Sequence, residues 1–322
     1  MMVIPKEERR AVRKDLGRVH RFVFLYTLMF TIFSFAAMVA SIIPQLVEQP
    51  NIALEKVEEI LMQQAGVYSL TALVFGLAFI LANRRKALFT EDLRAPERRA
   101  MTARIFVCCV VFFFTCQTAY ALLDPIVRSV AGFFGYSLYS TGDSLADVPN
   151  DLAMVLYAGF LGPIVEEVVF RGVIMRGLAK YGKIFAIVTS AALFGIFHGD
   201  IVQGIFAFGC GVMLGYVAME FGIGWSMVLH IVNNFVISEF FSHAIALLPL
   251  AWQEPIQTFL ILGLGVIGGG VVLWRNRTAI TSYCQTNHTE KGIIPILWTV
   301  PSFWLFVFME VWMISMGFTK VG

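Results

Sequence analysis

Residues 162–171 read Gly-Pro-Ile-Val-Glu-Glu-Val-Val-Phe-Arg and place Glu166 and Glu167 side by side within an apolar run. A carboxylate inside a membrane span is energetically costly, so such residues usually mark a functional site. Two later apolar runs, near 184–199 and 223–241, also carry polar residues. Together the three runs predict membrane helices that hold a polar site between them.

The composition is typical of a polytopic membrane protein. The 322 residues are 58% hydrophobic and 14% charged, with a mean hydropathy of +0.76, whereas a soluble domain carries roughly 25% charged residues. A helix needs about 20 apolar residues to cross the hydrocarbon core. Nine runs are long enough or nearly so, which predicts an all-α bundle of about nine transmembrane helices. They lie near 22–43, 64–82, 105–123, 152–170, 184–199, 203–221, 223–241, 256–274 and 293–318.

Charge in the predicted loops indicates the orientation of the chain. The segments 1–21, 83–104 and 171–183 are rich in Lys and Arg, whereas 44–63 and 124–151 carry mainly Glu and Asp. Basic loops tend to stay in the cytoplasm. Nine spans therefore place the N-terminus in the cytoplasm and the C-terminus outside.

Several features outside the three polar runs predict no chemistry. The run 22–43 is expected to be a retained anchor, because it exceeds the roughly 7–15 apolar residues of a signal peptide. The five cysteines include no Cys-x-x-Cys pair, which favours inert buried thiols. The chain has no Gly-rich phosphate loop, no Gly-x-Ser-x-Gly elbow and no basic, aromatic surface for nucleic acid. Glu310, near the outer end of the last run, is expected to face water.

The order of charged residues around the two glutamates predicts a division of roles. Residues four apart share a helical face, so Glu167 and Arg171 are expected to form a supporting ion pair. Neighbouring residues point about 100° apart, which leaves Glu166 to act as a base. The alternative is that both acids are solvated at the cytoplasmic end of the span.

Two of the five histidines fall in apolar runs that follow the carboxylate pair. A lone His in such a run is more often a satisfied core residue, but the coincidence favours a site. His198 ends the fifth run, and Phe194 shares its helical face and is expected to wall a pocket. His230 and Asn234 are four residues apart, so both project from one face and offer hydrogen-bond donors to an oxyanion.

A carboxylate, two imidazoles and an amide are suited to water-mediated hydrolysis, because a base activates the water and donors stabilise the oxyanion. The same groups could hold a divalent metal such as zinc through Glu166, His198 and His230, although the His-Glu-x-x-His signature is absent. The residues are also compatible with a proton-coupled transporter that uses Glu166 and His198 as a relay, and with a non-catalytic scaffold.

The three motifs resemble those of the CPBP, or Abi, family of intramembrane proteases, which includes the type II CAAX prenyl endopeptidases. The family pattern is Glu-Glu-x-x-x-Arg, then Phe-x-x-x-His, then His-x-x-x-Asn or Asp. The chain carries all three in this order, within roughly residues 150–245. The first 150 and the last 75 or so residues match no motif.

The resemblance implies an intramembrane endopeptidase of a prokaryotic plasma membrane, with a membrane-associated protein or peptide as substrate, possible prenylation of that substrate, and no nucleic-acid partner. Some relatives act in bacteriocin immunity or as scaffolds, which is the second hypothesis. The implied roles are Glu166 as base, His198 as helper in activating water, His230 and Asn234 as oxyanion pocket, and Glu167, Arg171 and Phe194 as support.

The motifs divide the chain into an N-terminal part (1–150), a catalytic core (151–245) and a C-terminal part (246–322). With a rise of about 1.5 Å per residue, Glu166 falls toward the cytoplasmic side of its span and His198 toward the outer side of the next. The two can meet if the helices around 171–187 extend into the cytoplasm, or if the turn at Gly199 lies inside the protein. We expect a short, buried hairpin near Gly199.

Overall fold

The computed structural model describes residues 5–88, 93, 99–138, 152–289 and 292–321. Residues 139–151, which belong to the predicted outer loop 124–151, lie outside this description, as do Arg94 and Arg98 of the predicted inner loop 83–104.

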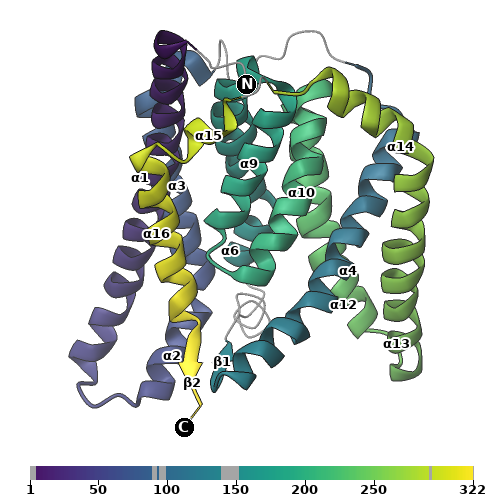
Figure 1. Cartoon of the computed structure of the whole chain (residues 1–322). Coiled ribbons are helices and arrows are strands. Elements are labelled where there is room, and N and C mark those ends of the chain that lie inside the picture. The colour runs from purple at the N-terminus through teal and green to yellow at the C-terminus, as the bar shows by residue number, and fades with distance from the viewer. Residues whose placement is uncertain (1–4, 89–92, 94–98, 139–151, 290–291, 322) are drawn as a thin grey trace.

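Helices make up almost all of the described chain (Figure 1). The N-terminal part contains α1 (Lys6–Glu48), α2 (Leu54–Gln63), α3 (Ala65–Ala87), α4 (Ala103–Phe133) and the strand β1 (Tyr136–Leu138). The central part contains α6 (Leu152–Met154), η2 (Val155–Leu161), α7 (Gly162–Glu167), η3 (Val168–Met175), α8 (Arg176–Leu178), η4 (Ala179–Tyr181), α9 (Lys183–Phe197), α10 (Ile201–Glu220), α11 (Ile223–Ile231), η5 (Val232–Phe240) and α12 (Phe241–Ala246). The C-terminal part contains α13 (Leu250–Thr258), η6 (Phe259–Gly268), α14 (Gly269–Thr286), α15 (Ile294–Leu297), α16 (Pro301–Met316) and β2 (Phe318–Lys320).

Within the described residues, seven helices are long and apolar enough to cross a membrane. Two of the nine predicted spans correspond to shorter apolar helices, Lys183–Phe197 and Pro301–Met316. The chain is therefore an all-helical integral membrane protein with seven candidate spans, and the count of nine stays a prediction. The N- and C-termini lie at opposite ends of the bundle in Figure 1, as an odd number of crossings requires.

The fourth apolar segment is longer than the sequence suggests. The predicted span 152–170 is part of one helix of 30 residues, Leu152–Tyr181. Glu166 consequently lies near the middle of this helix instead of close to one end. The polar residues after Phe170 continue the helix instead of forming the predicted loop, because Arg171 is buried and neutralised inside the bundle.

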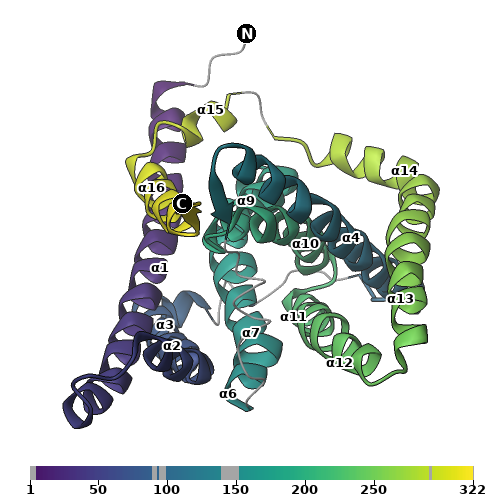
Figure 2. The same cartoon turned by 90° about the horizontal axis from the view of Figure 1, so that it is seen from below.

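The central helices form the core of the bundle. One apolar cluster joins α1, η3, α9 and α16, and a second joins α4, α10 and α11. Seen from below, α7, α9 and α10 lie between α1 on one side and α13 and α14 on the other (Figure 2). Large apolar side chains such as Val74, Ile267 and Phe308 lie 64%, 66% and 68% exposed on outer faces, where lipid would cover them.

Helices α9 and α10 pack against each other and are joined by three residues, His198, Gly199 and Asp200. Gly199 has φ of +61°, a left-handed conformation that glycine adopts at no steric cost. Asp200 Oδ1 accepts a hydrogen bond from the Gln203 N–H at 2.8 Å and so caps α10. This turn lies well above the lower ends of α1 and α4 in Figure 1. Its depth in the membrane is still a prediction.

A small sheet adds to the predicted all-α fold. β1 and β2 pair antiparallel, with Tyr136 opposite Lys320 and Leu138 opposite Phe318. The pairing holds residues 318–320 against the strand that follows α4.

Candidate functional site

Glu167 lies at the centre of a buried polar network. Its side chain is fully buried and takes part in three polar contacts. Arg171 Nη1 lies 3.0 Å from Oε1, His230 Nδ1 lies 2.9 Å from Oε1, and the Ser226 hydroxyl donates to Oε2. A buried carboxylate is tolerated only when it is paired and hydrogen-bonded. The predicted ion pair between Glu167 and Arg171 is therefore present, and it belongs to a larger network.

Arg171 contacts three groups: a carboxylate, a backbone carbonyl and an aromatic ring. Besides its ion pair with Glu167, Nη2 donates to the carbonyl of Gly211 on α10 at 3.3 Å, and the guanidinium lies 4.4 Å from the ring centroid of Phe194 on α9. These contacts tie the helix 152–181 to α9 and α10. They offset part of the cost of burying this charged side chain.

Glu166 points away from this ion pair, as neighbouring positions on a helix must. Its side chain is 15% exposed, and its Oε2 lies 3.6 Å from Nε2 of His230. His230 therefore stands between the two glutamates, with Nδ1 toward Glu167 and Nε2 toward Glu166. The structure brings Glu166 and His230 together.

His198 closes α9. Its Nδ1 lies 2.8 Å from the carbonyl oxygen of Phe194, and a carbonyl can only accept, so Nδ1 carries the proton in this contact. Nε2 is then left unprotonated in the neutral ring and is able to accept a proton. The ring also meets the Phe194 ring edge to face, with centroids 4.8 Å apart.

Asn234 lies one turn beyond His230, in the π-helical segment η5. Its Nδ2 donates to the carbonyl of Ala158 at 3.2 Å, and its Oδ1 accepts from Asn233 Nδ2 at 2.9 Å. An amide nitrogen has two protons, so one remains for another acceptor. π-helical turns often occur at functional sites.

A cavity of about 500 Å³ opens beside these side chains. Glu166, His198 and Asn234 line it, together with residues of α1 and α16. Phe194, which was expected to wall the pocket, is buried behind it at 2% exposure, and Phe197 lines the cavity instead. The reason is that the Phe194 ring is packed between Arg171, His198 and His230.

Glu310 also lines this cavity, contrary to the expectation that it faces water. It is only 2% exposed. Helix α16 packs against α1 and α9, which turns Glu310 inward. The sequence-based expectation placed Glu310 by its distance from the end of an apolar run, and that distance says nothing about which face of the helix is covered.

Ser226 is a site residue that the sequence analysis missed. It is fully buried, and besides contacting Glu167 its Oγ lies 3.0 Å from the carbonyl oxygen of Leu214. It precedes His230 by four residues and so shares its helical face. That spacing was the available signal.

The side chains at the site include suitable metal ligands, but they are not placed to hold one ion together. Two imidazoles and a carboxylate are suitable zinc ligands. Across the described ranges, however, no group of three or more His, Cys, Asp or Glu side chains is placed to hold an ion.

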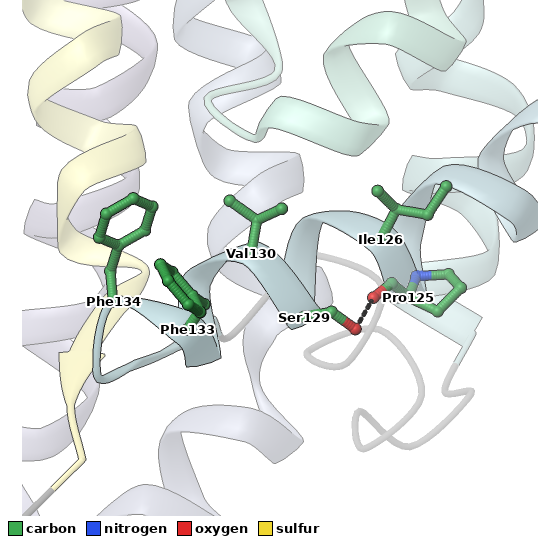
Figure 3. A pocket seen from close by; sticks show the side chains of 6 residues that line it. All are labelled: Pro125, Ile126, Ser129, Val130, Phe133 and Phe134. Atoms are coloured by element: carbon green, nitrogen blue, oxygen red, sulfur yellow. Dashed lines mark hydrogen bonds between the residues drawn. The ribbon is translucent and has the colours of Figure 1, made fainter.

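A second hollow lies on the outside of α4, far from these groups in the sequence (Figure 3). Six residues line it: Pro125, Ile126, Ser129, Val130, Phe133 and Phe134. The hydroxyl of Ser129 donates to the Pro125 carbonyl at 2.7 Å, and the other lining side chains are apolar. This hollow offers no acid or base, so we place the candidate site in the cavity beside Glu166.

Residues 148–236 match the family model described as type II CAAX prenyl endopeptidase Rce1-like. The chain is 26% identical over 202 residues to the Bacillus subtilis (strain 168) protein named "Putative membrane peptidase YdiL", and the alignment covers 60% of this chain and 74% of that protein. No solved structure gives a significant match. The matched segment contains Glu166, His198, His230 and Asn234.

Proposed function

We propose that this chain, which matches the Rce1-like model of type II CAAX prenyl endopeptidases over residues 148–236, hydrolyses a peptide bond of a membrane-associated protein through water activated by Glu166. A protease family implies a protein or peptide substrate. The observation that carries the proposal is the cavity lined by Glu166, His198 and Asn234. It puts a carboxylate, an imidazole and an amide around one space that can hold water and a peptide.

In the proposed reaction Glu166 accepts a proton from a water molecule, and the water oxygen attacks the carbonyl carbon of the peptide bond. His198 assists, because its unprotonated Nε2 can accept a hydrogen bond from the same water. When the C–N bond breaks, the proton held by Glu166 passes to the leaving amine. Glu166 thereby returns to its starting state.

The oxyanion of the tetrahedral intermediate needs donors that are already in place. The second amide proton of Asn234 is one candidate. Nε2 of His230 is another whenever it carries a proton, because it faces Glu166. Glu167 supports this arrangement by holding Nδ1 of His230 at 2.9 Å, which fixes the orientation of the ring.

The experiment is turnover of a library of quenched fluorescent peptides by the purified protein in lipid nanodiscs. Glu166→Gln keeps the shape of the side chain but removes its basicity, so we expect a loss of about 10²–10⁴-fold in kcat/KM. Glu59→Gln is the control, because Glu59 lies exposed on α2, and it should cleave like the wild type. Equal rates for Glu166→Gln and the wild type would refute the proposal.

We further propose that the N-terminus is cytoplasmic and the C-terminus external. Lys180 pairs with Asp15 and Lys183 pairs with Glu220, so basic residues from the ends of several helices lie together. The test uses Arg13→Cys and Val321→Cys with the exposed Cys284 replaced by Ser. A membrane-impermeant maleimide added to whole cells should label position 321 alone.

A further inference from the structure

Glu310 is a buried carboxyl group in the reaction cavity for which the proposed mechanism has no use. It lies on α16 (Pro301–Met316), outside the segment that matches the family model. It is 2% exposed, and its Oε1 has no hydrogen-bond partner among the described residues. A buried polar group without a partner is costly. The cavity therefore presents an acceptor that a ligand could satisfy.

The charges around the cavity favour one class of ligand. Its acidic lining side chains are Glu166 and Glu310, and no Lys or Arg is found among the described residues that line it. An anionic group would be repelled at short range by either carboxyl group in its ionised form. A cationic group would gain a charge-assisted hydrogen bond with Glu310, which is stronger than a bond between neutral partners.

Glu310 is also close to the reacting groups. A Cβ atom built on Gly199 would lie 3.5 Å from Glu310 Oε2, and Gly199 follows His198 directly. An extended peptide advances about 3.3 Å per residue. A side chain that reaches Glu310 therefore belongs to a residue near the bond held between Glu166 and His198.

We propose that Glu310 forms a cation-binding subsite, so that the enzyme prefers substrates with a Lys or Arg within about two residues of the cleaved bond. The proposal rests on the proposed function and names a class of substrate for the same cavity. Glu310 takes no part in the proton transfers. Its effect is on substrate recognition, so it should alter KM more than kcat.

The test compares three peptides that differ at one position near the cleaved bond, which holds Lys, norleucine or Glu. For the wild type we expect kcat/KM for the Lys peptide to exceed that for the norleucine peptide by about 10- to 100-fold, the range of a hydrogen bond to a charged group. The Glu peptide should be the slowest. Glu310→Gln should bring the Lys and norleucine rates close together, mainly through a higher KM for the Lys peptide.

Glu254→Gln is the matched control, because it makes the same chemical change at an exposed position on α13, and it should keep the preference for Lys. A preference for Lys that survives in Glu310→Gln would overturn the proposal, as would a wild type that cleaves all three peptides equally. Thermal unfolding of each variant shows whether it is folded.

A binding measurement separates this proposal from the proposed function. In the Glu166→Gln protein, the affinity for fluorescent Lys and norleucine peptides is compared with and without the additional Glu310→Gln change. Tighter binding of the Lys peptide that depends on Glu310 supports the subsite even if the wild type cleaves nothing. Equal affinities for the two peptides would refute the subsite even if cleavage is observed.

Discussion

Nδ1 of His230 lies 2.9 Å from Oε1 of Glu167, and both side chains are buried. The contact joins α11 to the helix 152–181 at the depth of the cavity. Because Arg171 lies 3.0 Å from the same oxygen, the orientation of His230 depends on a charge network that itself does not line the cavity. We therefore expect changes to that network to affect the reaction by altering the orientation of His230.

Ser226→Ala tests this dependence. The hydroxyl has one proton and two acceptors within reach, and the carboxylate of Glu167 is the stronger acceptor. Loss of the Ser226 hydroxyl should lower the free energy of unfolding by about 1–3 kcal/mol. We expect peptide turnover to fall by about tenfold, on the order of 1.4 kcal/mol, because Glu167 holds His230 less firmly.

Ser129→Ala provides the comparison, since Ser129 is exposed and bonds only within its own helix. It should change neither the unfolding transition nor turnover. A Ser226→Ala protein with wild-type values in both measurements would show that the hydroxyl contributes nothing to the network.

Arg171→Met tests whether the buried charge of Glu167 depends on its pairing with Arg171. The change leaves the Glu167 carboxylate buried without its cation, and breaking a buried pair in this way typically costs about 3–5 kcal/mol. The double variant Glu167→Gln with Arg171→Met removes both charges and should recover part of this loss. Unfolding in detergent, followed by tryptophan fluorescence, measures all four proteins of the cycle.

If the losses in the free energy of unfolding were strictly additive in this cycle, the two side chains would not interact. Activity should stay low in the double variant even where stability recovers, since the neutral amide introduced by Glu167→Gln offers His230 no negative charge.

Much of the architecture could be predicted from the sequence. Apolar runs of membrane length indicated the helical bundle, and the four-residue spacing indicated the pairing of Glu167 with Arg171. The three motifs predicted a resemblance to a family whose model matches residues 148–236. These features depend on local patterns, and local patterns are what a sequence displays directly. The catalytic roles of Glu166, His198, His230 and Asn234 are still predictions.

The features that escaped prediction depend on contacts between distant segments. The span predicted to end near residue 170 continues to Tyr181, an extension that the sequence offered only as one of two alternatives. Gly211 on α10 and Phe194 on α9 contact the guanidinium of Arg171 within it. Glu310 faces the cavity because α16 packs against α1 and α9. Neither arrangement can be read from the hydropathy of the segment itself.

Asn234→Ala tests the oxyanion role. The substitution removes the amide proton that the Ala158 contact leaves unused, and a missing oxyanion donor typically lowers kcat by about 10²–10³-fold. Binding of a substrate peptide to the Glu166→Gln protein should change little when Asn234→Ala is added, because the donor acts mainly on the intermediate. A loss confined to KM would instead identify Asn234 as a residue that binds the substrate.

Gly195→Ala tests the contact that positions His198. A Cβ at Gly195 on α9 would lie 2.6 Å from the carbonyl oxygen of Gly204 on α10, so the two helices would have to move apart close to the turn that carries His198. Such overpacking typically costs about 1–3 kcal/mol, which outweighs the roughly 1 kcal/mol that Ala gains over Gly in a helix. We therefore expect a lower unfolding temperature and a reduced kcat. Gly224→Ala on α11, where a Cβ meets nothing within 4 Å, should be neutral or slightly stabilising. If both variants unfold and cleave alike, the close approach of α9 and α10 does not position His198.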